Sequence, residues 1–172
     1  MKKIAALIMI LSGAAAMAQV RSSGDIDTKA FVIGLDQSAA AGSNLDFTVG
    51  GETATISVSA TEVSVGSATL FNTTDTPADA LMAGIHDFTG DSRPEIVVGY
   101  RAGNVVGAEI WTLRQGEWTK IGSMNSSGSS ECRIFRQALT IKNPSNGALY
   151  SWTWHKDRFD FKASDGSSDP TK

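Results

Sequence analysis

The sequence predicts an all-β domain, an antiparallel sandwich or barrel-like fold with one short helix. Roughly nine or ten short strand-like segments follow one another at intervals of about ten residues, with Gly- or Asn-containing turns between them. No long helical segments alternate with these strands, which argues against a parallel α/β sheet. The chain has 172 residues, a length that supplies one packed core without disulfides.

Alternation of polar and apolar residues at period two predicts strands with one buried and one exposed face. Residues 53–60 and 62–65 show this most clearly, and Thr61 lies at a tight turn between them. The turns at Gly50-Gly51 and at 143–147 separate other strands. We expect these further strands at 30–35, 45–49, 96–100, 107–113, 118–124, 132–141, 149–154 and 158–162.

The predicted helix is short. Thr76 is suited to cap it, Pro77 to its first position, and Asp79 to its first turn, where unpaired N–H groups meet a carboxylate. The body of the helix spans 78–83 and ends at Gly84.

The first residues have the composition of a bacterial signal peptide. Two Lys precede an apolar stretch at 4–11, which is too short to span a bilayer, and Ala16-Met17-Ala18 supplies small residues for cleavage before Gln19. We therefore expect a signal peptide at 1–18, a single all-β domain at 19–163 and a disordered tail at 164–172, in a periplasmic or secreted protein. A retained N-terminal anchor is the alternative, and we expect no membrane span in the mature chain.

Removal of the signal peptide leaves 13 basic and 18 acidic residues, a net charge of −5. This balance does not favour nucleic-acid binding, which requires clustered Lys and Arg. Arg133, Arg136 and Lys142 are the nearest approach to such a cluster, and a solvated strand edge explains them. Cys132 is the single cysteine, so we expect a small buried residue and no disulfide.

The most specific segment is 86–98, in which three carboxylates recur at every fourth position before an apolar strand. Ca²⁺ prefers six to eight oxygen ligands, and a loop with this spacing is able to wrap one ion. The candidate metal ligands are the side chains of Asp87, Thr89, Asp91 and Glu95 and the backbone carbonyl of Arg93. The alternative is a metal-free turn whose carboxylates accept backbone N–H groups.

This segment resembles the Asp-x-Asn-Gly-Asp-Gly-x-Pro-Asp-Ile/Leu-Val signature of FG-GAP/VCBS-type repeats, the calcium-loop blades of integrin-like propellers. The resemblance covers 85–120 and implies a blade-like strand-turn-strand unit with a bound calcium. Thr89 stands where the family has Asn or Asp, and Ser92 replaces a left-handed Gly. One motif does not supply the four or more blades of a propeller. We therefore expect one blade-like unit and not a complete propeller.

Tyr150, Trp152 and Trp154 share one face of a predicted strand, and we expect them in the core rather than exposed to a sugar or a partner. His86 and His155 are the two histidines and are candidate general bases, but no Ser or Cys lies in a recognisable nucleophile motif. We therefore expect no enzyme.

The sequence thus predicts an exported, non-catalytic binding or structural protein with a protein or glycan ligand, which a bound calcium would stabilise. One alternative is a periplasmic inhibitor of a lysozyme-type enzyme, because we expect such small all-β inhibitors to carry a similar acidic segment. The other is a glycan-active hydrolase that uses two carboxylates from the set Asp87, Asp91, Glu95, Asp157 and Asp160.

Overall fold

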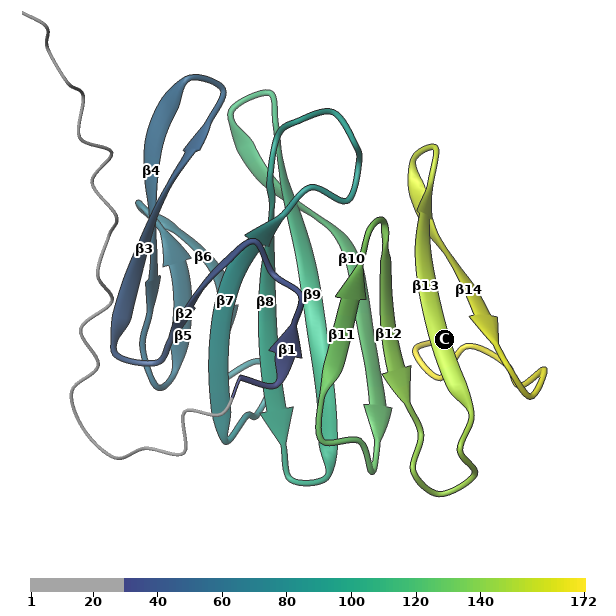
Figure 1. The fold of residues 1–172 in the computed structure, drawn as a ribbon. Coiled ribbons are helices and arrows are strands. Elements are labelled where there is room, and N and C mark those ends of the chain that lie inside the picture. Colours follow the sequence, from purple (N-terminus) through teal and green to yellow (C-terminus); the bar gives the residue numbers. More distant parts are fainter. Residues whose placement is uncertain (1–29) are drawn as a thin grey trace, which may run out of the picture.

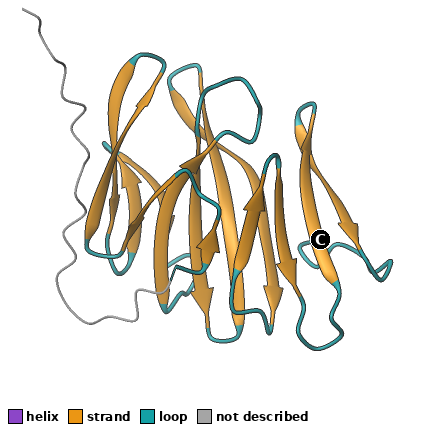
Figure 2. Ribbon diagram, viewed as in Figure 1, coloured by secondary structure: helices purple, strands orange, loops and turns teal. Residues whose placement is uncertain are grey.

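The computed structural model describes residues 30–172, so the predicted signal peptide lies outside the described part. Between these residues the chain forms fourteen β-strands and no helix (Figures 1 and 2). The all-β class is confirmed, and the strands form three open sheets rather than a closed barrel. Residues 30–172 therefore contain no helix that is long and apolar enough to cross a membrane.

Each sheet contains one run of four consecutive antiparallel strands. The first sheet has the order β3 (Ser43–Val49), β4 (Glu52–Val58), β5 (Glu62–Val65), β6 (Ala68–Asn72). The middle sheet has the order β10 (Glu117–Ser127), β9 (Val105–Arg114), β8 (Glu95–Ala102), β7 (Ala80–His86), β2 (Gln37–Ala40). The third sheet has the order β1 (Val32–Ile33), β11 (Cys132–Phe135), β12 (Ala138–Lys142), β13 (Leu149–His155), β14 (Arg158–Ala163).

The three sheets stack face to face, with the middle sheet between the other two (Figure 1). Ile96 and Val98 of β8 belong to the core shared with the first sheet, whereas Val97 belongs to the core shared with the third. Ala83 and Met82 divide in the same way on β7. A continuous apolar run such as that of β8 is typical of a strand with both faces covered, and the stack provides both covers.

The N-terminal segment, residues 31–40, connects the third sheet to the middle sheet. Its first strand, β1, pairs in parallel with β11, and β2 pairs antiparallel with β7. The carbonyl of Phe31 accepts the N–H of Cys132 at 2.8 Å, and the N–H of Asp36 donates to the carbonyl of Ile85 at 2.9 Å. The beginning of the described chain therefore holds two later sheets together.

Two glycines leave room for this segment. A Cβ at Gly84 would lie 2.3 Å from the carbonyl oxygen of Gln37, and a Cβ at Gly99 would lie 2.3 Å from Cγ2 of Val32. Both glycines have ordinary negative φ angles, so the requirement is for space and not for an unusual backbone conformation. The N-terminal segment packs on the middle sheet because both positions lack a side chain.

The predicted helix is wrong. Residues from Ala80 onward form β7, which pairs with β8 on one side and with β2 on the other. Asp79 has a different role from the predicted one, since its carboxylate accepts the N–H of Gly103 at 2.6 Å. Its own N–H donates to the carbonyl of Arg101 at 2.6 Å, so Asp79 fixes the β8–β9 turn.

The predicted strand at 132–141 is two strands. β11 and β12 form a tight hairpin, and Arg136 occupies its turn with a left-handed φ of 53°. Arg133 and Lys142 are therefore on neighbouring strands instead of along one edge. The strand expected at 30–35 is confined to β1, and β2 and β6 were not predicted, because each is short and has a weak alternation.

The other strand predictions and the core assignment of the aromatic residues are confirmed. Tyr150, Trp152 and Trp154 are all buried, as is Cys132. Burial raises the pKa of the Cys132 thiol to about 12, so this cysteine is an inert core residue. In the segment expected to be a disordered tail, the carboxylate of Asp169 accepts the indole N–H of Trp152 at 3.4 Å.

We predict that Gly84→Ala lowers the free energy of unfolding by about 1–3 kcal/mol, because the added methyl group overpacks the contact between β7 and β2. Urea unfolding measures the loss, and amide hydrogen exchange shows whether β2 has lost protection. Ser57→Ala, an exposed change on β4, is the control. Unchanged stability with full protection of β2 would contradict the packing described here.

Candidate functional site

The acidic segment forms the connection between β7 and β8. His86 and Glu95 are direct partners at the end of the ladder, and residues 87–94 form the loop between them. Phe88 turns inward and is completely buried, in edge-to-face contact with Phe159 at a ring-centroid distance of 5.5 Å. This anchor draws the loop back onto the core, so the polar residues on either side of Phe88 fold around one another.

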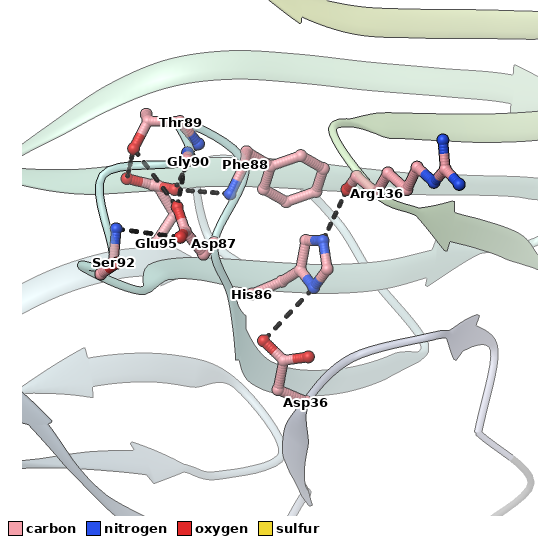
Figure 3. A network of polar contacts seen from close by, with 9 residues as sticks. All are labelled: Asp36, His86, Asp87, Phe88, Thr89, Gly90, Ser92, Glu95 and Arg136. Atoms are coloured by element: carbon pink, nitrogen blue, oxygen red, sulfur yellow. Dashed lines mark hydrogen bonds and ion pairs between the residues drawn. The ribbon is translucent and has the colours of Figure 1, made fainter.

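Glu95 is the buried centre of the loop, with an exposed fraction of 1%. Its Oε2 accepts the backbone N–H groups of Phe88 at 2.8 Å and Thr89 at 3.3 Å. Its Oε1 lies 3.4 Å from the hydroxyl of Thr89 (Figure 3). The same oxygen lies 3.2 Å from the hydroxyl of Thr112 on β9. The carboxylate therefore satisfies donors at the start of the loop and one on the neighbouring strand.

Asp87 closes the outer part of the same loop. Its Oδ1 accepts the N–H of Gly90 at 2.7 Å, and its Oδ2 accepts the N–H of Ser92 at 3.0 Å (Figure 3). Ser92 has a left-handed φ of 66°, the conformation that the family signature gives to a glycine, at a cost of about 1–2 kcal/mol for a residue with a Cβ. Asp91 accepts the N–H of Arg93 at 2.8 Å, in a turn of its own.

The environment of Glu95 disfavours its charge. Burial raises the pKa of the Glu95 carboxyl above its ordinary 4.5, the N–H groups of Phe88 and Thr89 oppose that shift, and the negative charge of Asp87 adds to it. None of the ion pairs between described side chains involves Asp87 or Glu95. Two neighbouring carboxylates thus share a site of N–H and O–H donors, and neither is paired with a described cationic side chain.

The donor types in this site fit a hard cation such as Ca²⁺, and the structure brings part of the predicted ligand set together. The hydroxyl of Thr89 lies 3.5 Å from Asp87 and 3.4 Å from Glu95. Asp91 instead accepts the N–H of Arg93 within a separate turn. Within 30–172, no three Asp, Glu, His or Cys side chains form a group suited to a metal. The loop as described is held by its own hydrogen bonds, and Asp87, Thr89 and Glu95 are the residues that would contact an ion.

A histidine contact beside the loop was not predicted from the sequence. His86 Nε2 lies 2.6 Å from the carbonyl oxygen of Arg136 in the β11–β12 turn, and Nδ1 lies 3.4 Å from the carboxylate of Asp36 (Figure 3). Its ring packs edge-on against Phe88 at 4.8 Å. His86 therefore joins the N-terminal segment, the middle sheet and the third sheet. Its partners, Asp36 and Arg136, each lie 50 residues away in the sequence, and no local sequence pattern predicts contacts over that separation.

Four of the five carboxylates proposed for the hydrolase alternative lie in two separate settings, and the fifth, Asp157, is exposed in the turn between β13 and β14. Asp87, Asp91 and Glu95 accept hydrogen bonds within the loop. Asp160, on β14, is held by Arg158 at 3.0 Å and by His155 at 3.2 Å. Hydrogen bonds from these two side chains, that of Arg158 first, lower the pKa of the Asp160 carboxyl, so it is an ionised member of a surface ion-pair network.

Comparison with known proteins adds no relative: no family model, no curated protein and no solved structure matches the chain. The resemblance to FG-GAP/VCBS-type repeats therefore stays a prediction that depends on the residues of the loop itself.

We predict that Glu95→Gln flattens part of the pH dependence of stability. Because the pKa of Glu95 is raised in the folded state, the folded protein binds this proton more tightly than the unfolded chain does. Stability contributed by this group is therefore lost as the pH rises from about 4.5 through the folded pKa. Gln retains an acceptor for the N–H of Phe88 without the charge.

We expect the unfolding free energy of Glu95→Gln to rise relative to that of the parent between pH 4 and pH 8. Urea unfolding at each pH measures it, and the exposed Glu117→Gln is the control. A relative unfolding free energy that does not change with pH, or that falls as the pH rises, would show that the pKa of Glu95 is not raised in the folded state.

Proposed function

We propose that the chain is an exported, non-catalytic binding and structural protein of the periplasm or cell exterior, with a protein or glycan as its partner. The observation that supports this proposal is the use of the carboxylates: Asp87 and Glu95 hold a loop in shape, and Asp160 belongs to an ion-pair network. In each of these residues, the carboxylate oxygens that catalysis would require are engaged in hydrogen bonds or ion pairs that stabilise the fold.

The chemistry of glycoside hydrolysis supports the same conclusion. It needs two carboxyl groups on opposite sides of one scissile bond, about 5–9 Å apart, one of them protonated and free to donate. Glu95 has the raised pKa expected of such an acid. However, its two oxygens face donors of the loop and of β9, and its exposed fraction of 1% leaves no access for a sugar.

Calcium is a second part of the proposal. Asp87, Thr89 and Glu95 would hold the ion, and its charge would offset the repulsion between the two carboxylates, which no described cation relieves. An extracellular module of this kind binds Ca²⁺ with a dissociation constant on the order of 10⁻⁴–10⁻³ M. The ion would act on stability and not on a reaction.

For the absence of catalysis, we expect the purified protein to release no soluble sugar from dye-labelled peptidoglycan beyond the background of Asp160→Asn and Glu95→Gln variants. A pelleting measurement on the same samples reports binding independently of turnover. Release by the parent that is lost in either variant would contradict the proposal and would favour a hydrolase.

For calcium, we expect 5 mM Ca²⁺ to raise the unfolding free energy of the parent by about 1–2 kcal/mol, the gain that mass action gives for a site of this affinity. Calorimetric titration of Ca²⁺ should give heat of binding in the parent and none in Glu95→Gln. Glu117→Gln is again the matched control, since it removes one charge from an exposed position.

Absence of both heat and stabilisation in the parent would leave the metal-free turn as the complete account of the loop. That result would remove the calcium part of the proposal and leave the binding function, because the pelleting measurement tests binding separately.

A further inference from the structure

The charges of the described chain are separated along the stack of sheets. Residues 43–72, which span the whole first sheet, contain no Lys or Arg and three acidic residues, Asp46, Glu52 and Glu62. Residues 131–163, which include β11–β14, contain six basic and three acidic residues, a net charge of +3. Figure 1 shows the first and third sheets at opposite ends of the stack.

The outward side of the first sheet, here called the acidic face, is polar throughout. The burial pattern turns Phe47, Ile56 and Val63 inward. Its outward side chains are Asn44, Asp46, Thr48, Thr53, Thr55, Ser57, Glu62, Ser64 and Thr69. Asp46 and Glu62 accept hydrogen bonds from threonines, and neither belongs to an ion pair between described side chains.

The outward side of the third sheet, here called the basic face, has the opposite character. Lys142 and Lys162 are exposed and belong to no ion pair between described residues, whereas Arg133 is paired with Glu131. The two exposed large apolar side chains of residues 30–172, Phe135 at 70% and Leu149 at 45%, lie on the same sheet. A shallow hollow on this face is lined by residues that include Arg133, Lys142 and Leu149.

We propose that the basic face of one copy of this chain docks on the acidic face of a second copy, so that the stack of sheets continues from molecule to molecule. Opposite unpaired charges face each other in this arrangement, and charge complementarity of this kind selects orientation and partner. The inference is independent of the calcium and catalytic proposals, because it uses neither the acidic loop nor its carboxylates.

The same charges exclude the other ways of pairing two copies. A two-fold dimer through the basic face would place Lys142 and Lys162 against their own copies, and a two-fold dimer through the acidic face would bring Asp46 and Glu62 together. Like charges in direct opposition are unfavourable. The contact must therefore be head-to-tail, and because the two faces lie at opposite ends of the stack, each added copy leaves one free face of each kind.

The interface would be weak and dependent on salt. The inner faces of the stack are apolar, but the docking faces consist mainly of Ser, Thr and charged side chains. Exposed charges are screened over about 10 Å at 0.1 M salt and about 3 Å at 1 M. Association should thus increase with protein concentration and decrease as salt is added.

The test is sedimentation equilibrium of the mature protein, residues 19–172, at low salt, near 20 mM NaCl, and at 500 mM NaCl. We expect concentration-dependent association of the parent at low salt and its loss at high salt. Lys142→Glu/Lys162→Glu and Asp46→Lys/Glu62→Lys should each remain monomeric when alone. An equimolar mixture of these two variants should associate again, because each retains the face that complements the other.

Arg114→Glu/Lys156→Glu is the control for the lysine variant, since it makes the same change of net charge at the end of β9 and in the β13–β14 turn, and it should associate like the parent. Circular dichroism establishes that each variant is folded. A monomeric parent at low salt, association unchanged in either face variant, or a mixture that stays monomeric would each overturn the proposal. Binding of a different acidic protein by a monomeric parent would do the same.

Discussion

The rest of the structure depends on burial of both faces of the middle sheet. β8 enters that sheet with Ile96, Val97 and Val98, none of which is exposed, and a strand of this kind is stable only when both sides are covered. The first and third sheets supply the covers, and the N-terminal segment closes one edge through β2. Glu95 is the first residue of the same strand, so the fold that buries the apolar run also buries a carboxylate, which must find its donors within reach.

The end sheets have a different task. Each covers the middle sheet with one face and meets water with the other, so their sequences alternate between apolar and polar residues. Because only the outward residues are free of packing demands, differences in charge are able to accumulate there without cost to the core. The separation of acidic and basic residues along the stack is therefore compatible with the fold but not required by it. For this reason, the end faces are informative about function and the inner faces are not.

The sequence predicts best what depends on near neighbours. Alternation in residues 53–65 and the turn at Thr61 are local, and the structure has both. The prediction of a short helix is wrong because it depends on local signals at Thr76, Pro77 and Asp79. The strand β7 forms instead because it pairs with β2, more than 40 residues earlier. The repetition of four-stranded units was missed for a related reason. Only the middle unit carries the acidic motif, and the matching turns at Gly50-Gly51 and Arg136-Gln137 are too short to resemble it.

The acidic loop shows why the same residues supported two predictions. A calcium site and a self-contained turn both need carboxylates at these positions, so their spacing does not distinguish them. In the structure, all four carboxylate oxygens of Asp87 and Glu95 already have donors from the loop or from β9. A cation would share these oxygens and would not replace the donors. The shape of the loop therefore follows from its hydrogen bonds and from the anchor at Phe88. A bound ion would compensate only the charge of the carboxylates.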